Sequence, residues 1–506
     1  MSQQDAARSA GRGGLALTGA KIYFIALGLV QQIALPRVLG LDGYGALSRV
    51  LSIASVAYNP ITTMSIQAVS RSVVEAPAAE LPGTVRRLLS WHALFGVAVA
   101  AAFALLTPTI ATLAGASHVE TPLRILSGVL LAYAIYTPLI GVANGQKRFV
   151  LQAGFDVTSA TLRTVGLVAG AVVAQRALAA HGPTGSAVGF VASAVLVLVV
   201  SAIAIGTGRS GASSLDLPSY LLLAIPIWFG QMLLNLLFQA DLTLLGRFAS
   251  EAAEATSAPL SRADALVGAY RATQLFSFLP YQILIAITFI LFPMLAGAAQ
   301  AKDADAIARY VRTGMRLALI IAGAMVSVTL GLAPRLLALL FGTEAAALGG
   351  RALGLLSLGF GAFAIFGILT TVLNSLHRQW YSLLVTGFAV LVVATLCFWR
   401  ARGAALSEDL LWLTAQATAT GLLVATAIAG FLVYEAAGAL VSPWTALRTL
   451  LALGVAALSA RFLVPPGKLL TLVGAAVTPA IYLAVLLLTR ELGRADLEMI
   501  RRVVKR

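Results

Sequence analysis

The sequence predicts an all-α protein that crosses a membrane about fourteen times. Hydrophobic residues make up 59% of the 506 residues and charged residues only 11%, whereas a soluble domain carries about 25% charged residues. The mean hydropathy is +0.92. Fourteen windows of about 20 residues are nearly free of charge, and this is the length that a helix needs to cross the hydrocarbon core of a bilayer.

The fourteen windows follow one another with short connections. They cover residues 15–35, 44–69, 88–114, 123–145, 150–174, 184–205, 218–246, 266–296, 316–341, 351–376, 380–399, 410–434, 447–464 and 469–489. Because no connection is longer than about 20 residues, the chain has no room for a folded domain outside the membrane. We therefore expect its function to take place within the bilayer.

The spans fall into two predicted lobes and an extra pair. The first six spans end near residue 205, and the segment 206–217 is rich in Gly and Ser, as linkers are. Six is an even number, so a second six-helix lobe at 218–435 enters the membrane from the same side as the N-lobe at 1–205. Such lobes are parallel repeats, related by an axis along the membrane normal. The two spans within 447–489 have no counterpart and are expected to be appended.

The distribution of charge predicts an orientation. The net charge is +15, and the basic residues lie mainly in short loops at the span ends. Placing the N-terminus in the cytoplasm puts about twice as many of them inside as outside. We expect both termini to be cytoplasmic, with residues 490–506 as a basic tail attracted by anionic lipids. This distribution does not favour nucleic acid as a partner.

The sequence predicts neither an enzyme nor a metal site. The only cysteine, Cys397, excludes an intramolecular disulfide, and the four histidines are not spaced as metal ligands. No nucleophile elbow or phosphate-binding loop occurs. We expect no cofactor, and glycine pairs such as Gly166 with Gly170 indicate close helix packing.

A short stretch recurs in both halves of the chain. Residues 35–49 read LPRVLGLDGYGALSR and break the run between the first two spans. Residues 245–271 hold LGRFAS and VGAYR, the beginning of VGAYRAT, around a longer, polar insert. Aligning Gly45 with Gly268 makes the two stretches correspond. Each leads an arginine into the span that follows, and the insert is expected on the outer face.

Three arginines lie inside predicted spans, namely Arg49, Arg163 and Arg271. An arginine at the centre of a span costs about 2.5–3.5 kcal/mol on insertion scales, so each needs a compensating role. For Arg49 and Arg271 the alternatives are snorkelling to the interface, an ion pair, or a place in a cavity. Arg163 shares a helical face with Asp156, where an internal network through Ser159 and ligand binding are both open.

Polar stripes accompany these arginines. At about 100° per residue, the stripe of the second span covers roughly a quarter of the helix surface, so it must face a partner helix or a wet cavity. It comprises Arg49, Ser52, Asn59, Thr63, Gln67 and Ser70. Repeat symmetry would gather the first, second, seventh and eighth spans around one axis, and we expect a cationic cavity there.

The predicted substrate-binding residues are Arg49, Arg271, Arg163, Lys21, Asn59, Gln231, Asn235 and Gln274. Two carboxylates, Asp241 and Asp156, are predicted to form ion pairs or to bind a coupling proton or cation such as H+ or Na+. For Asp241 the expected partner is Arg271 or Arg247. Guanidinium groups suit phosphate oxygens and the neighbouring amides suit sugar hydroxyls, so a lipid pyrophosphate that carries an oligosaccharide fits the predicted cavity.

Four segments carry a resemblance to a known family. Residues 35–56, LPRVLGLDGYGALSRVLSIASV, resemble the opening of the Wzx-type lipid-linked oligosaccharide flippases of the multidrug/oligosaccharidyl-lipid/polysaccharide (MOP) exporter superfamily. Residues 241–248, 267–280 and 289–295 read DLTLLGRF, VGAYRATQLFSFLP and FILFPML, and are similar to the matching family segment.

This resemblance implies two six-helix lobes in a V shape, which alternate access. They would move an undecaprenyl-pyrophosphate-linked oligosaccharide from the inner to the outer leaflet of the bacterial inner membrane, for polysaccharide, lipopolysaccharide O-antigen or capsule synthesis. Polysaccharide-assembly membrane proteins are implied as partners. Relatives that flip the peptidoglycan precursor carry arginines on helices 1, 2 and 8, where this chain has Lys21, Arg49 and Arg271. It departs from them in having a lysine at the start of helix 1.

Other functions stay open at this point. A peptidoglycan-precursor flippase and a cation-coupled multidrug exporter belong to the same superfamily, and an exporter should carry acidic residues in its lobes, where only Asp156 and Asp241 qualify. A polymerase or ligase would need a large outer loop. A scaffold without transport would leave the polar stripes unexplained.

Overall fold

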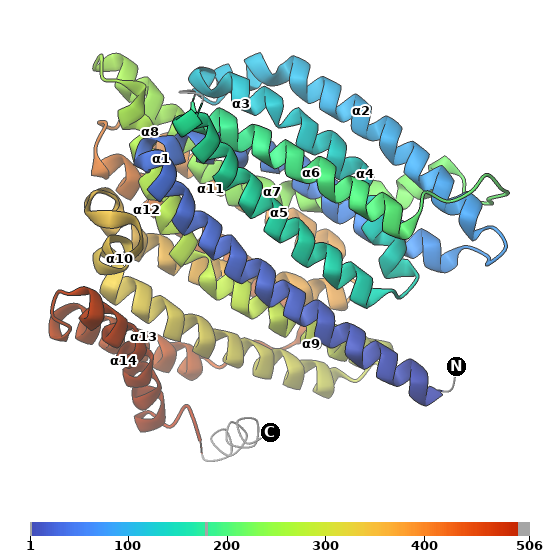
Figure 1. The fold of residues 1–506 in the computed structure, drawn as a ribbon. Coiled ribbons are helices and arrows are strands. Elements are labelled where there is room, and N and C mark those ends of the chain that lie inside the picture. The colour runs from blue at the N-terminus through green and yellow to red at the C-terminus, as the bar shows by residue number, and fades with distance from the viewer. Residues whose placement is uncertain (1–2, 178–180, 494–506) are drawn as a thin grey trace. The chain divides into compact units, whose positions relative to one another are not determined.

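A computed structural model of the protein describes residues 3–177 and 181–493. Every regular element within these ranges is a helix, which confirms the predicted class (Figure 1). The elements are α1 (Gln3–Glu75), α2 (Leu81–Leu113), the short 3-10 helix η1 (Ser117–Val119), α3 (Glu120–Ile125), α4 (Ser127–Gly145), α5 (Phe149–Ala177), α6 (Gly182–Ile205), α7 (Leu217–Ala255), α8 (Leu260–Ser277), α9 (Leu279–Gln300), α10 (Ala304–Ser375), α11 (Gln379–Ala401), α12 (Glu408–Ala437), α13 (Pro443–Leu463) and α14 (Lys468–Leu488).

The described chain has 12 helical segments long and apolar enough to cross a membrane. Two of them, α1 and α10, run through a non-helical glycine, and each covers two of the predicted spans. The glycines are Gly40, with φ 76° and ψ 171°, and Gly342, with φ 91° and ψ 173°. These dihedrals are open essentially to glycine alone. The chain changes direction there without a loop, and the number of fourteen separate crossings stays a prediction.

The helices form two compact units, Met1–Gly268 and Ala269–Arg506. The first unit holds α1 to α7 and the first half of α8, and the second holds the remainder. The segment 206–217, predicted as the linker between lobes, lies within the first unit, where α7 packs against α1. The division into two six-helix lobes stays a prediction.

Within the first unit, α5 and α6 lie side by side (Figure 1). A methyl group on Gly166 would collide with the backbone of Gly189, and one on Gly170 would collide with the carbonyl oxygen of Gly185. The glycines therefore allow the two backbones to touch, as the sequence predicted for Gly166 and Gly170.

Within the second unit, α10 packs against α9, α12, α13 and α14. Tyr482 of α14 is fully buried and lies against Gly323 of α10, where an added methyl group would collide with its hydroxyl. The same hydroxyl donates to the backbone carbonyl of Leu319 at 3.4 Å. The two helices predicted as an appended pair are thus anchored to α10.

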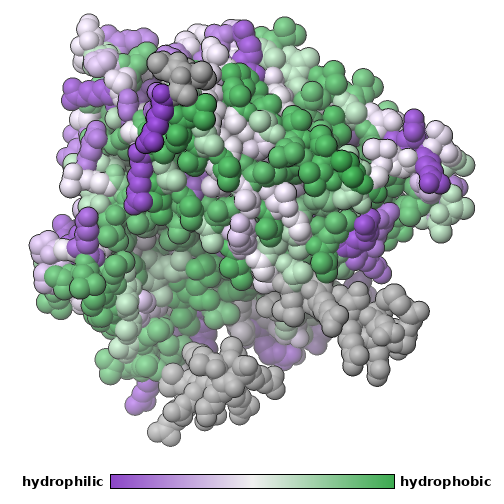
Figure 2. All heavy atoms as spheres, in the orientation of Figure 1, coloured by the Kyte–Doolittle hydropathy of each residue, from purple (hydrophilic) through white to green (hydrophobic). Residues whose placement is uncertain are grey.

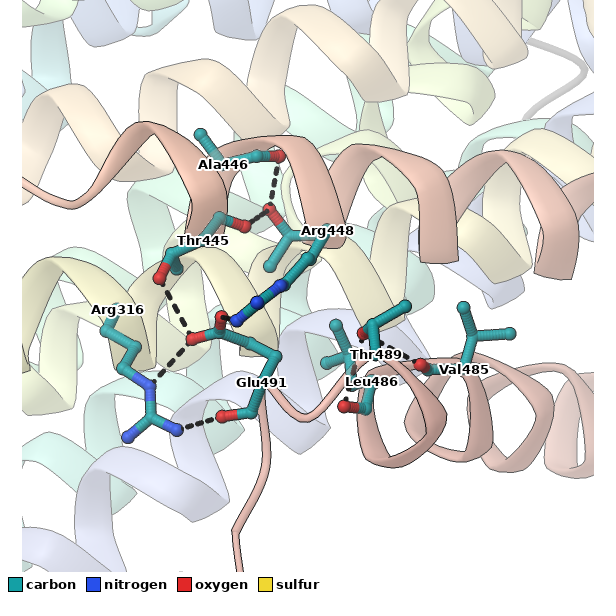
Figure 3. Close-up of polar contacts among 9 residues, drawn as sticks. Arg316, Thr445, Ala446, Arg448, Val485, Leu486, Thr489 and Glu491 are labelled. Atoms are coloured by element: carbon teal, nitrogen blue, oxygen red, sulfur yellow. Dashed lines mark hydrogen bonds and ion pairs between the residues drawn. The ribbon is translucent and has the colours of Figure 1, made fainter.

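A buried carboxylate ties the end of the described chain to this unit (Figure 3). Glu491 is 4% exposed and lies 2.9 Å from Nε of Arg316 on α10 and 3.2 Å from Nη1 of Arg448 on α13. The Thr445 hydroxyl donates to the same carboxylate at 3.0 Å. Of the predicted basic tail 490–506, only the part up to Gly493 is described, and the rest lies outside the described residues.

Several helices end in the same kind of turn. In the described residues the non-glycine residues with positive φ are Lys147, Ser257, Lys302, His377 and Arg490. In each case this residue and the next donate to helix carbonyls three and five residues earlier, which is the Schellman arrangement. Four of the five are basic, and a positive charge complements the carboxyl end of a helix.

Candidate functional site

The polar stripe of the second span faces a partner helix. The Asn59 side chain donates to Oδ1 of Asn235 at 2.8 Å, and the Ser52 hydroxyl donates to Oε1 of Gln239 at 2.9 Å. Asn235 in turn donates to the backbone carbonyl of Gln231 at 2.9 Å. The periodicity left open whether the stripe faces a partner helix or a wet cavity. Ser52 and Asn59 face a partner helix, because their polar groups form hydrogen bonds with α7.

Arg49, at the head of that stripe, is 3% exposed and lies in an internal network. Its Nε is 2.7 Å from Oδ1 of Asp264, whose other carboxylate oxygen lies 2.9 Å from Nε2 of His118. Its Nη1 donates to the carbonyls of Gly246 and Gly115 at 2.8 and 3.1 Å and to the Ser250 hydroxyl at 3.0 Å. Of the alternatives predicted for Arg49, which were snorkelling, an ion pair or a place in a cavity, the structure shows the ion pair. Arg49 could contact an anion only if this network opened.

A close helix crossing brings Arg49 to Asp264. A methyl group on Gly45 would collide with the backbone carbonyl of Asp264, and one on Gly268 would collide with that of Leu41. The two helices therefore touch through glycine. Arg49 lies one turn after Gly45, and Asp264 lies one turn before Gly268, so both side chains reach the same point.

Asp264 is the functional residue that the sequence interpretation missed. The predicted eighth span began at residue 266, and Asp264 was assigned to a polar insert on the outer face. In the structure α8 begins at Leu260, and α7 continues to Ala255, so most of that insert is helical. The match of Gly45 with Gly268 was the available signal, because a glycine crossing brings the neighbouring turns of both helices together.

A second polar cluster lies between α1 and α5 and includes Lys21 and Asp156. The Lys21 ammonium lies 3.1 Å from the Asp156 carboxylate, with the lysine side chain 63% exposed and the aspartate 16%. On the same two helices, the Tyr23 hydroxyl is 2.9 Å from that of Thr161. Lys21 thus presents a charge to its surroundings while Asp156 holds it in place.

Arg163 lies within α5 on an aromatic surface. Its guanidinium carbon is 5.0 Å from the centroid of the Phe190 ring, and that ring packs edge to face against Tyr133 and Tyr58. In the described ranges, Arg163 forms no ion pair, and its Nε is buried without a hydrogen-bond partner. The internal network with Asp156 expected as one alternative is absent there, since Asp156 pairs with Lys21. A guanidinium inside a span with unused donors is suited to an anion.

The remaining predicted residues divide between the two units. Arg271, half-buried in the second unit, donates from Nη1 to Oε1 of Gln274 at 2.9 Å. Asp241, in the first unit, is fully buried, and its Oδ1 accepts the backbone N–H of Leu242 at 2.7 Å. Arg247, one of its expected partners, forms an ion pair with Glu251 at 2.8 Å.

The segment before α7 is bound to the start of α2. Nη1 of Arg87 donates to the carbonyls of Ser213 and Leu215 at 3.0 and 2.7 Å. Glu80 accepts the Ser214 N–H at 2.5 Å. That hydrogen bond, together with the charge of Arg87, lowers the pKa of the Glu80 carboxyl below its usual range. The contact is therefore complete above the ordinary carboxyl pKa and is lost as the pH falls through the lowered value.

Comparison with known proteins adds a family and a fold. Residues 10–298 match the family described as polysaccharide biosynthesis protein. No curated protein matches the chain significantly.

The solved structures that the chain resembles are transporters. The lipid II flippase MurJ in an inward closed conformation has 12% sequence identity and a TM-score of 0.74 over 94% of this chain and 99% of its own. An inward-facing multidrug resistance MATE family transporter of the MOP superfamily has 14% identity and a TM-score of 0.65 over 85% and 96%. A MOP superfamily transporter from Pyrococcus furiosus has 14% identity and a TM-score of 0.55 over 88% and 97%.

At these identities the likeness shows the fold, which is that of the MOP transporters, and it does not show a substrate. The family match is of another kind, because it rests on the sequence and extends over more than half of the chain. The chain is therefore a multi-pass membrane protein that belongs to the polysaccharide biosynthesis protein family.

Proposed function

We propose that the protein is a flippase that moves an undecaprenyl-pyrophosphate-linked oligosaccharide from the inner to the outer leaflet of the bacterial inner membrane by alternating access. The observation that carries this proposal is Arg163, a guanidinium inside a membrane-spanning helix that has no ion pair in the described chain. The exposed Lys21 lies on α1, which packs against the same helix. Phosphate oxygens would use the free donors of Arg163. The match to a polysaccharide biosynthesis family supports a glycan as the cargo.

The proposed roles follow from the chemistry of each side chain. Arg163, Lys21 and Arg271 bind the pyrophosphate, and Gln231 and Gln274 contact sugars. Arg49, Asn59 and Asn235 are engaged in internal contacts. Asn59 and Asn235 become available only when α1 and α7 separate, and Arg49 only when α1 also separates from α8. Of the two carboxylates expected to bind a coupling H+ or Na+, Asp241 takes this role, because Asp156 is already paired with Lys21.

The proposed architecture is two parallel six-helix lobes and two appended helices, with both termini in the cytoplasm. The turn between α4 and α5 supports the repeat, because the turn between α10 and α11 has the same form. Lys147 and His377 have φ of 59° and 58° at corresponding positions, and an arginine follows each. We propose polysaccharide-assembly membrane proteins as partners.

Arg163→Ala tests the proposal in a strain that lacks the gene. We expect the variant to restore transport about 10- to 100-fold less well than the original protein, because a charge-assisted bond to phosphate is lost. Mass spectrometry of polyprenyl-linked glycans, with their leaflet determined, gives the readout. Arg176→Ala is the control, since Arg176 lies exposed on the same helix. Transport at the original rate by a normally expressed Arg163→Ala variant would show that the assignment is wrong.

The same strain separates two alternative functions. The likeness to the MurJ fold favours a peptidoglycan-precursor flippase as the second candidate, and accumulation of that precursor would identify it. A cation-coupled multidrug exporter would instead give a strain with raised drug susceptibility and no accumulated glycan lipid. Asp156 does not favour this function, because its carboxylate is already paired with Lys21.

A further inference from the structure

A groove lies between the beginning of α5 and the end of α6, separate from the residues of the proposed transport site. Its volume is about 720 Å³, and its lining includes Lys147, Arg148, Val150, Phe155, Thr158 and Val200. All of these belong to the first compact unit. The groove is apolar along the two helices and carries both of its charges at one end.

The charged end is a rigid turn. The N–H groups of Lys147 and Arg148 donate to the carbonyls of Asn144 and Ala143 at 2.9 and 2.8 Å. The Asn144 side chain bridges Ser70 of α1 and Gln152 of α5, at 2.8 and 2.9 Å. Hydrogen bonds therefore fix the turn to α4, α1 and α5, and the two basic side chains extend from adjacent positions of its backbone.

These two cations have no internal counter-charge. Both side chains are exposed, and in residues 3–177 and 181–493 neither forms an ion pair or a side-chain hydrogen bond. This differs from Lys21, Arg49, Arg247 and Arg316, each of which meets a carboxylate. The turn therefore offers two adjacent positive charges to a ligand.

The walls of the groove are suited to hydrocarbon. Val150 and Val200 are 64% and 40% exposed, and Gly154 leaves the α5 wall open, with nothing within 4 Å of an added methyl group. Figure 2 shows hydrophobic side chains over much of the face drawn. Both helices are long and apolar enough to span a membrane, so acyl chains are the natural neighbours of these walls.

We propose that this groove binds an anionic glycerophospholipid, with its phosphate at Lys147 and Arg148 and an acyl chain along Val150, Thr158 and Val200. A basic pocket between spanning helices is the usual form of such a site. A free anion would leave the apolar walls unused, and a neutral lipid would leave both charges unused. A phospholipid uses both, and its abundance in the bilayer favours occupancy of a groove this open.

Native mass spectrometry of the purified full-length protein tests the proposal, with phosphatidylglycerol and phosphatidylcholine of equal chain length as probes. We expect preferential retention of phosphatidylglycerol. The double substitution Lys147→Asn with Arg148→Gln should weaken it about 30-fold, and asparagine tolerates the left-handed backbone at position 147. Val200→Trp should weaken binding as well, by filling the groove without changing charge.

Two matched controls accompany these variants. His377→Asn with Arg378→Gln alters the corresponding turn between α10 and α11, where Arg378 lies over the Tyr381 ring at 5.4 Å. Val199→Trp adds the same bulk at a neighbouring exposed position that does not line the groove. Both should retain phosphatidylglycerol as the original protein does, and a thermal shift assay shows which variants are folded.

Five results would overturn the proposal. The first four are equal retention of the two lipids, unchanged retention in the Lys147 and Arg148 variant, unchanged retention in Val200→Trp, and displacement of the lipid by inorganic phosphate at comparable concentration. A polyprenyl pyrophosphate that displaced phosphatidylglycerol at much lower concentration would overturn it too, by assigning the groove to the transported lipid. The proposal does not depend on the proposed function, because lipid retention is measured without transport.

Discussion

Asp264 balances the charge of a buried arginine and contacts a histidine ring at the same time. Its two carboxylate oxygens lie 2.7 Å from Arg49 and 2.9 Å from His118. Both the arginine and the aspartate are almost fully buried, at 2% and 7% side-chain exposure. A buried charge without a partner lowers the stability of the fold. Replacing both Arg49 and Asp264 by apolar residues should therefore destabilise the protein less than replacing either one alone.

Asp264→Ala should lower the free energy of unfolding by about 3–5 kcal/mol, because it leaves the Arg49 charge buried and unpaired. Thermal unfolding of the purified protein in detergent measures the change. The combined substitution Arg49→Met with Asp264→Leu should recover much of the loss, since it removes both charges.

The control for this prediction is Glu251→Ala. Glu251 pairs with Arg247 at 2.8 Å, but it is 45% exposed, so the expected change is within about 1 kcal/mol. Equal effects of Asp264→Ala and Glu251→Ala would contradict the role assigned to Asp264.

At the scale of elements, two glycines divide the longest helices. Gly40 and Gly342 interrupt α1 and α10 with φ of 76° and 91° and ψ near 180°. A Cβ at Gly342 would meet no atom within 4 Å. The constraint at this position is therefore in the backbone and not in the packing.

Gly342→Ala should lower the free energy of unfolding by about 1–3 kcal/mol through backbone strain alone. Gly297→Ala on α9 is the matched control, because it too has nothing within 4 Å but lies in a regular helix. There alanine should be neutral or stabilising by up to about 1 kcal/mol. The difference between the two variants, measured by thermal unfolding, isolates the cost of the dihedral angles.

On the scale of the molecule, the appended helices are part of the second unit's core. Tyr482 fills the space over Gly323, and Glu491 links α10, α13 and the segment after α14 through Arg316 and Arg448 (Figure 3). The two arginines are 33% and 37% exposed, so solvent screens part of this attraction.

Glu491→Ala should lower the free energy of unfolding by about 2 kcal/mol, less than a fully buried pair would cost. We also expect faster proteolysis after α14, because the segment loses its attachment. Glu435→Ala, an exposed position on α12, serves as the control. A cleavage rate that does not change in Glu491→Ala would show that Tyr482 and the helix packing hold the segment without the ion pairs.

Part of the site could be predicted from the sequence. The spacing of the stripe identifies Asn59 as a residue that needs a polar neighbour, and the structure joins it to Asn235 by a hydrogen bond. Arg163 was recognised by the cost of its charge. Asp264 could not be recognised in the same way, because a polar insert hid the start of its helix and because nothing in the spacing of α1 identifies the helix it meets.

Composition and periodicity alone specify the class of protein, the approximate spans and the polar face of each helix, because they act along one helix at a time. What each polar face meets is visible only in the folded chain. The stripe of α1 meets α7, Arg49 meets Asp264, Asp156 meets Lys21, and Arg163 meets an aromatic ring. Ion pairs and helix crossings join residues far apart in the chain, so the pairing depends on packing between helices and not on the pattern within one.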